Sequence, residues 1–136
     1  MEGIKKVSET RNEAIIWPIH PRTTKRLKEF KLSIPKLVKA IQPLGYLEFL
    51  QLEEKAALIM TDSGGLQEEG CIFKVPCVTL RDNTERPETL EIGSNIIVGV
   101  KPNNILKGVK EMMKRKNNWK NPFGDGKAAE RIMGII

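Results

Sequence analysis

The sequence predicts an α/β protein, a three-layer sandwich around a mainly parallel, Rossmann-like sheet of about five strands. The apolar run over residues 56–60 is uninterrupted, as expected for a strand buried on both faces of a sheet. Apolar runs of this kind alternate along the chain with amphipathic helical patterns, which is the order of strands joined by crossover helices. The 136 residues suit one domain with one core, which we place over residues 1–136.

The first half of the chain shows this alternation from its start. Ile4 and Val7 lie on one face of a short polar helix over residues 1–12. Leu27 and Phe30, among lysines and arginines, predict a surface helix with a narrow buried stripe. The elements of this half are a helix over 1–12, a strand over 14–19, a helix over 22–31, a weaker strand over 37–41 and a helix over 46–55.

The second half continues the pattern after the strand at 56–60. Pro102 opens a clear amphipathic helix. In the last helix we expect Ala128, Ile132 and Ile135 to face inward. The elements of this half are a short helix ending near Ile72, a strand over 76–80, a polar loop over 81–88, a short helix over 87–92 closed by Gly93, a strand over 95–99, a helix over 102–115, a loop over 117–126 and a helix over 127–136.

Charge and cysteine content narrow the class of protein. Lys and Arg number 23 and Asp and Glu 17, and the net charge of +6 suits an anionic ligand, a nucleic acid or a merely soluble protein. Cys71 and Cys77 lie in apolar surroundings, so we expect reduced core cysteines, and we predict neither a metal nor a cofactor. With no stretch long enough to span a membrane and no signal-peptide core, the chain is expected in the cytoplasm.

The residues TDSGGLQEEG, at positions 61–70, join the buried strand to the next helix. The first turn of a helix has unpaired N–H groups and a partial positive charge, so this turn predicts an anion site. Ser63 can cap the helix, and Gly64 and Gly65 let a phosphate approach the backbone closely. Glu69, about one and a half turns further on, can accept hydrogen bonds from a neighbouring sugar. A capped turn with nothing bound is an equally open interpretation.

Polar residues follow several of the other strands. In parallel α/β sheets, ligands bind beyond the carboxyl ends of the strands. His20, Asp62 and the loop over 81–86 lie at such ends, and the turn over 43–45 lies at the same rim. We therefore expect these residues to meet at one crevice.

Four motifs in this order and spacing carry a family resemblance: WPIHP (17–21), TDSGGLQEE (61–69), RDNTERPE (81–88) and NPFGDG (121–126). They resemble the C-terminal domain of the non-hydrolysing UDP-N-acetylglucosamine 2-epimerases, over nearly the whole chain. The resemblance implies the C-terminal half of a GT-B fold. It also implies an isomerase of nucleotide-sugar metabolism and polysaccharide biosynthesis, which interconverts UDP-N-acetylglucosamine and UDP-N-acetylmannosamine by elimination and re-addition of UDP.

The same resemblance assigns UDP-binding roles to residues of this chain. Ser63, Gly64 and Gly65 would hold the diphosphate, as the helix N-terminus already suggests, and Glu69 would take the ribose hydroxyls. Arg86 would add a cation on the phosphate side, where a guanidinium can grip two oxygens at once.

Three further residues complete these assignments, and structural alternatives remain open for several of them. Phe49 would pack on the uracil, or belong to the helix core. Leu44 stands where the family often has Gln, so it could contact the base only through its backbone. His20 would touch phosphate or order the rim, or be a structural histidine. The alternative for Arg86 is a salt bridge to Glu85 or Glu88.

Parts of the family pattern are absent from the sequence. The first is the N-terminal domain, which carries the catalytic carboxylates. The second is the His-Arg-x-Glu-Asn motif, which lies on the strand that opens the C-terminal domain. We therefore assign no catalytic residue and expect the isolated chain to be inactive. In the family that strand lies centrally, between the strand ending at His20 and the strand ending at Thr61, so we expect the sheet to lack one central strand. The implied partners are UDP-N-acetylglucosamine or UDP and an N-terminal half, present as a separate chain or through a homo-oligomer.

Other functions remain open on the sequence alone. A non-catalytic nucleotide-sugar-binding or regulatory module would keep the same binding residues. A nucleic-acid binder would fit the net charge of +6, but aromatic residues are not interleaved with the basic ones, so nucleic acid is not an expected partner. A phospho-acceptor role for Asp62 would leave the motifs unexplained.

Overall fold

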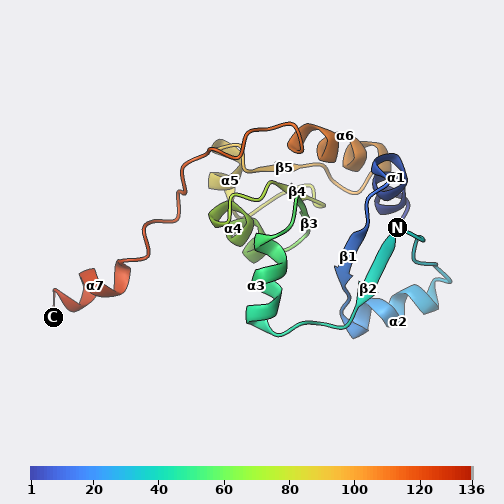
Figure 1. The fold of residues 1–136 in the computed structure, drawn as a ribbon, viewed down its shortest axis with the longest axis horizontal. Coiled ribbons are helices and arrows are strands. Elements are labelled where there is room, and N and C mark those ends of the chain that lie inside the picture. Colours follow the sequence, from blue (N-terminus) through green and yellow to red (C-terminus); the bar gives the residue numbers. More distant parts are fainter. Residues whose placement is uncertain (136) are drawn as a thin grey trace.

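The computed structural model of the protein describes residues 1–135, in which the predicted elements follow one another in the predicted order (Figure 1). The helices are α1 (Glu2–Arg11), α2 (Pro21–Glu29), α3 (Tyr46–Glu54), α4 (Gly64–Ile72), α5 (Pro87–Glu91), α6 (Pro102–Met112) and α7 (Ala128–Met133). The strands are β1 (Ile15–Pro18), β2 (Val38–Ile41), β3 (Ile59–Thr61), β4 (Cys77–Thr79) and β5 (Asn95–Ile97). Each helix in this part of the chain is too short or too polar to cross a membrane.

The strands form two parallel sheets rather than one. In the first, β1 pairs with β2, and Ile15 lies opposite Val38. In the second, β4 lies between β3 and β5, and Cys77 lies opposite both Ile59 and Asn95. Within the described residues, β1 and β3 therefore each have one hydrogen-bonded neighbour. The division lies between β1 and β3, where the family resemblance predicts that one central strand is missing.

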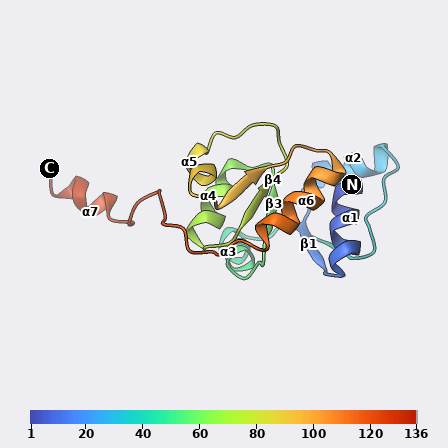
Figure 2. The same ribbon diagram turned by 90° about the horizontal axis from the view of Figure 1, so that it is seen from above.

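Helices cover both faces of the sheets, as predicted for a three-layer sandwich. α1 and α6 pack on each other along one side, while α3 and α4 lie on the other (Figures 1 and 2). Ile15 of β1 and Met60 of β3 pack against the same apolar cluster, so one helix layer joins the two sheets. The buried members of that cluster are Val7, Val78, Ile105, Val109 and Met112.

A smaller apolar cluster lies between the second sheet and α4. Its buried members are Ile59, Val75 and Cys77. Cys71 and Cys77 are both free and fully buried, as the sequence predicts. Burial raises the pKa of the Cys77 thiol to about 12, so the group stays protonated and acts as a small apolar side chain.

The close packing of α6 on β5 depends on Gly108. A Cβ atom at this position would lie 2.5 Å from Val98 Cγ1 and 3.1 Å from Ile96 Cδ1. We expect Gly108→Ala to lower the free energy of unfolding by about 1–2 kcal/mol, because overpacking outweighs the better helix propensity of alanine. Urea unfolding followed by circular dichroism measures this difference. Gly134→Ala is the control, since its Cβ would have its nearest neighbour at 3.5 Å, and equal stability of all three proteins would contradict the prediction.

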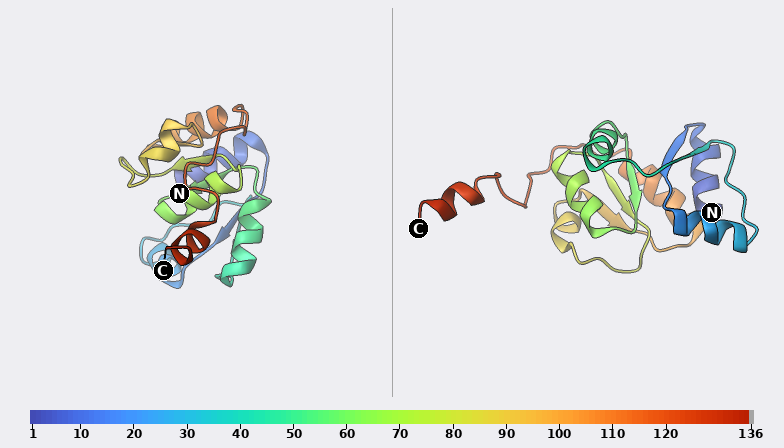
Figure 3. Two further views of the ribbon diagram at one scale, coloured as in Figure 1. Left: turned by 90° about the vertical axis from the view of Figure 1, so that its left-hand side faces the viewer. Right: turned by 90° about the horizontal axis from the view of Figure 1, so that it is seen from below.

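Part of one helix face and the whole of another that the sequence predicts to be buried are exposed. Phe30 is 65% exposed, and Leu27 is the buried residue of α2. The inward orientation predicted for Ala128, Ile132 and Ile135 is wrong, since α7 has no buried residue and Ile135 is 85% exposed. Helical spacing predicts an apolar face but not what covers it, and α7 lies away from the rest of the molecule (Figures 1 and 3). Ile136, the last residue of the predicted helix, lies outside the described residues.

Trp119 fixes the point at which the chain leaves the packed body. Its side chain is buried, and its Nε1–H donates a hydrogen bond to the carbonyl oxygen of Cys71 at 3.0 Å. The ammonium of Lys74 lies 5.9 Å from the centre of the Trp119 ring and donates to the Trp119 carbonyl oxygen. The segment after Trp119, residues 120–135, is called the C-terminal arm below.

Candidate functional site

The turn between β3 and α4 has the geometry of an anion site. Ser63 is the N-cap residue of α4, and its hydroxyl makes no hydrogen bond to the helix amides. Its backbone N–H donates to Thr61 Oγ1 at 3.0 Å, which fixes the turn. A Cβ atom on Gly65 would have Ser63 Oγ, at 3.7 Å, as its one neighbour within 4 Å in the described structure. The first-turn amides therefore border open space that a negatively charged ligand can occupy.

Arg86 brings a positive charge to the same turn. It precedes α5, and its Cζ atom lies 3.8 Å from the position that a Cβ atom on Gly64 would take; the Oε2 atom of Glu85 lies 3.6 Å from the same position. Its guanidinium forms an ion pair with Glu68 of α4 and donates to the backbone carbonyl oxygen of Glu85 at 3.0 Å. The salt-bridge partner is thus neither of the carboxylates considered from the sequence, Glu85 and Glu88. The guanidinium therefore makes an ion pair with α4 in addition to a hydrogen bond within its own loop.

A buried polar network supports the loop that carries Arg86. Thr84 Oγ1 accepts a hydrogen bond from the Arg86 backbone N–H at 3.0 Å and donates to Gln67 Oε1 at 2.5 Å. Asn95 Nδ2 donates to the same Gln67 oxygen and to Thr89 Oγ1, both at 3.1 Å. Gln67, Thr89 and Asn95 are almost completely buried. This network was not predicted from the sequence. The one residue that could have indicated it is Asn95, a polar residue at the start of an apolar strand.

The remaining predicted UDP-binding residues lie on or beside α3 and α4. Glu69 is half-buried on α4. Phe49 is half-buried on α3, and this helix packs against α4. Leu44 lies just before α3 and is 36% exposed, so its side chain is accessible at the rim.

His20 follows β1, which belongs to the other sheet. It is exposed, and its Nδ1 accepts a hydrogen bond from the backbone N–H of Arg22 at 3.1 Å, which caps α2. The contacts of His20 within the described residues are therefore those of a structural, helix-capping histidine.

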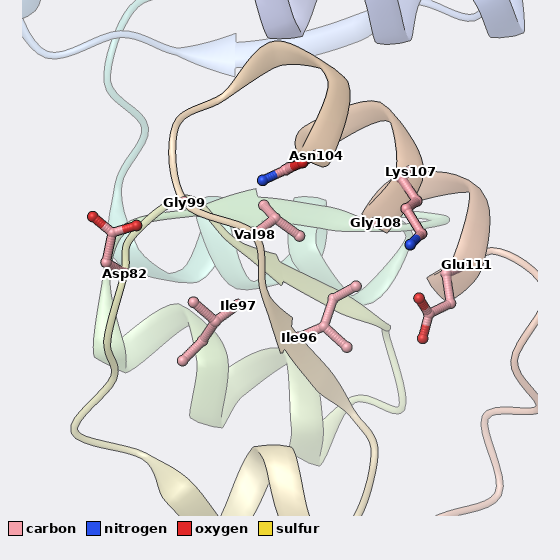
Figure 4. Close-up of a pocket in the computed structure, with 9 residues that line it drawn as sticks. All are labelled: Asp82, Ile96, Ile97, Val98, Gly99, Asn104, Lys107, Gly108 and Glu111. Carbon is pink, nitrogen blue, oxygen red and sulfur yellow. The ribbon is translucent and has the colours of Figure 1, made fainter.

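The surface is hollowed at a different place, between β5 and α6. Figure 4 shows this hollow of about 490 Å³, lined by Ile96 and Val98 from the strand side and by Lys107 and Glu111 from α6. Asp82 reaches it from the loop after β4. None of the predicted UDP-binding residues lines this hollow, so it is separate from the turn at Ser63.

The fold and the turn define a Rossmann-like α/β protein with a glycine-rich turn where the edge strand β3 meets the N-terminus of α4. A family model described as UDP-N-acetylglucosamine 2-epimerase matches residues 1–136, and the chain belongs to this family, as the four motifs predict.

Two curated relatives and one solved structure show how far the similarity extends. The chain is 59% identical to the UDP-N-acetylglucosamine 2-epimerase of Methanocaldococcus jannaschii over its whole length, and 56% identical over 98% of its length to that of Methanococcus maripaludis. It covers 38% of each of these relatives. The crystal structure of the Methanocaldococcus jannaschii enzyme in complex with UDP-GlcNAc and UDP is 60% identical, with a TM-score of 0.90 over 98% of this chain and 38% of that one.

Proposed function

We propose that this chain supplies the UDP-binding part of a UDP-N-acetylglucosamine 2-epimerase, as a single domain over residues 1–136. The observation that carries the proposal is that Arg86 lies beside Gly64 in the first turn of α4, while the next residue of that turn, Gly65, is exposed. A helix N-terminus with an adjacent guanidinium suits a diphosphate, because both favour negative charge and both present N–H donors. The similarity to an enzyme solved with UDP-GlcNAc and UDP supports the same ligand.

The residues around this position can bind different parts of the nucleotide. The diphosphate would accept hydrogen bonds from the amides of Gly64 and Gly65 and from the Ser63 hydroxyl. Glu69 would accept from the ribose hydroxyls, and the half-buried Phe49 ring would pack on the uracil. Leu44 would contribute a backbone contact to the base, and we assign His20 no direct contact.

The proposed reaction needs groups that this chain does not supply. Interconversion of UDP-N-acetylglucosamine and UDP-N-acetylmannosamine by elimination and re-addition of UDP requires a base and an acid near C2 of the sugar. It also requires stabilisation of the departing UDP. The turn and Arg86 would provide that stabilisation. We place the acid and base on an N-terminal part, present as a separate chain or in another copy of an oligomer.

Two features support such a partner. The edges of β1 and β3 that face the division are unpaired within the described residues, so an added strand would complete the sheet. The C-terminal arm exposes Ile132, Met133 and Ile135, which suits an apolar surface outside this chain.

The buried free thiols of Cys71 and Cys77 fit the cytoplasm, where we place the protein.

Calorimetric titration with UDP tests the proposal. Arg86→Ala is expected to weaken UDP binding about 10- to 100-fold, because it removes a charge-assisted contact and leaves Glu68 unpaired beside the phosphates. Ser63→Ala, which removes one neutral hydrogen bond, should weaken it about fivefold. Arg22→Ala, an exposed arginine on α2, is the matched control and should bind as the wild type does. Absence of heat from UDP even with the N-terminal part present would overturn the proposal.

Activity separates an enzyme part from the alternative function, a non-catalytic nucleotide-sugar-binding or regulatory module. The 136-residue chain alone should show no epimerase activity, and activity should appear when the N-terminal part is added. UDP binding without activity in the mixture would favour the non-catalytic module. Turnover by the chain alone would contradict the placement of the acid and base elsewhere.

A further inference from the structure

Asn95 is a buried polar side chain whose hydrogen bonds join four elements of the fold. It begins the apolar strand β5 and is 1% exposed. Its Oδ1 accepts from Thr79 Oγ1 of β4 at 2.8 Å. Its Nδ2 donates to Gln67 Oε1 of α4 and to Thr89 Oγ1 of α5, both at 3.1 Å. A buried amide that uses both of its N–H groups in this way holds its neighbours in place, because losing either bond costs the desolvation of a buried polar group.

The first of these two N–H groups leads to the backbone nitrogen of Arg86. Gln67 Oε1, which accepts from Asn95, also accepts from Thr84 Oγ1 at 2.5 Å. Because the Thr84 hydroxyl gives its one proton to Gln67, its lone pairs are left for a donor, and the Arg86 N–H supplies one at 3.0 Å. The position of the Arg86 nitrogen is therefore set through α4.

The second N–H group leads to the carbonyl oxygen of the same arginine. Thr89 Oγ1, which accepts from Asn95, donates to the Arg86 carbonyl oxygen at 2.7 Å. The backbone N–H of Thr89 donates to the same oxygen at 3.1 Å. The N–H and the C=O of Arg86 are thus held by two separate paths, and both begin at the amide group of Asn95. The backbone of Arg86 cannot shift without breaking one of these hydrogen bonds.

The side chain of Arg86 extends from this backbone to the first turn of α4. Its guanidinium forms an ion pair with Glu68, and its Cζ atom lies 3.8 Å from the position of a Cβ atom on Gly64. α4 therefore contacts both ends of the arginine, the backbone through Gln67 and the guanidinium through Glu68. A shift of about 1 Å would weaken a contact with phosphate strongly, since charge-assisted hydrogen bonds need N–O distances of about 2.7–2.9 Å.

We infer that Asn95 is a positioning residue for the phosphate-binding arginine, and that its two hydrogen bonds place Arg86 where the guanidinium can contact the diphosphate of UDP. This inference rests on the proposed function, because it takes the ligand of Arg86 to be a diphosphate. Asn95 itself does not contact the ligand, since it is almost fully buried. A change at Asn95 should therefore alter UDP binding only while the arginine is present.

The test is a double-mutant cycle, in which calorimetry gives the dissociation constant of UDP for the wild type, Asn95→Ala, Arg86→Ala and the double variant. Asn95→Ala is expected to weaken UDP binding about tenfold, because it removes most of the effect of one charge-assisted contact. In the Arg86→Ala background the same substitution should change the affinity less than about twofold. Equal losses in the two backgrounds would overturn the inference, because a general loosening of the fold acts with or without the arginine.

Two milder variants test the two paths without a cavity at Asn95. Thr84→Val and Thr89→Val each remove the hydroxyl of one path, and each should weaken UDP binding about three- to fivefold. Ser8→Ala is the matched control. It removes a buried hydroxyl on α1, outside the network, and should bind UDP as the wild type does. Wild-type affinity in both threonine variants would overturn the inference.

Amide hydrogen exchange followed by NMR tests the placement of the arginine without a ligand. Asn95→Ala and Thr84→Val should speed exchange of the Arg86 N–H at least about tenfold. The Leu80 N–H, which donates to the Thr61 carbonyl oxygen at 2.8 Å, is the internal reference and should change less. Exchange at Arg86 that is unchanged, or accelerated no more than at Leu80, would overturn the inference. Absence of UDP binding in the wild type would instead overturn the proposed function, and the exchange of the Arg86 N–H would still decide whether Asn95 places the arginine.

Discussion

Gly65→Asp is expected to weaken UDP binding at least about 100-fold while leaving the free energy of unfolding unchanged or slightly higher. The two effects separate because the position is open. A Cβ atom at Gly65 makes an ordinary contact, at 3.7 Å from Ser63 Oγ, and a carboxylate in the first turn of α4 favours the helix by about 0.3–1 kcal/mol. The same carboxylate repels a diphosphate at that turn by about 4 kcal/mol per pair of charges near the surface. Calorimetry with UDP and thermal unfolding measure the two quantities.

Gly65→Asn is the matched control for Gly65→Asp. It adds a side chain of nearly the same size without a charge, so it should weaken UDP binding much less than the aspartate. Equal losses for the two variants would show that the amides of α4 are blocked by size. An unchanged affinity for Gly65→Asp would mean that the anion does not bind at this turn.

The second large effect concerns the stability of the protein between about pH 5 and pH 8. Glu53 is buried at the end of α3, and this burial, with the nearby charge of Glu69, raises the pKa of its carboxyl from about 4.5 in the unfolded chain to about 7 in the folded protein. The folded state therefore holds the proton more tightly, and the stabilisation is complete below about pH 4.5 and lost as the pH rises through 7. We expect the free energy of unfolding to fall by about 2–3 kcal/mol over this range. Urea unfolding at a series of pH values measures the slope.

Glu53→Leu should abolish most of this slope and be more stable than the wild type at pH 8, because no charge is then buried. Glu54→Leu is the control, since Glu54 is exposed on the same helix. The carboxylates with lowered pKa values are Glu13, Glu85 and Asp125. They are exposed and paired with arginines, and their small contributions change at more acidic pH. A profile of Glu53→Leu parallel to that of the wild type would contradict the assignment of the slope to Glu53.

Much of the fold could be predicted because it depends on local patterns. The apolar run before Thr61 and the amphipathic spacing of Ile105, Val109 and Met112 each encode one element, and the structure confirms them. The orientation of α7 could not be predicted in this way. Its apolar residues have helical spacing, but whether Ile132 is buried depends on a surface that the local sequence does not contain.

The candidate site was predictable only in part. The turn at Ser63 and the position of Arg86 follow from motifs in which residue type and spacing carry the information. The contact between Arg86 and Glu68 joins two helices, and no local pattern specifies it. The burial of Glu53 could not be predicted either. A glutamate near the end of a helix in which polar and apolar residues alternate is expected to face water, and only the packing of α3 on α4 shows that it is buried.

The division between the sheets has a consequence for how the protein behaves in concentrated solution. The facing edges of β1 and β3 offer rows of backbone donors and acceptors to any extended peptide, and Ile16 beside them is 47% exposed. Copies of the chain can form hydrogen bonds with each other through these rows, which favours self-association and precipitation. If the proposed N-terminal part covers these edges, producing the two together will keep the protein from self-associating.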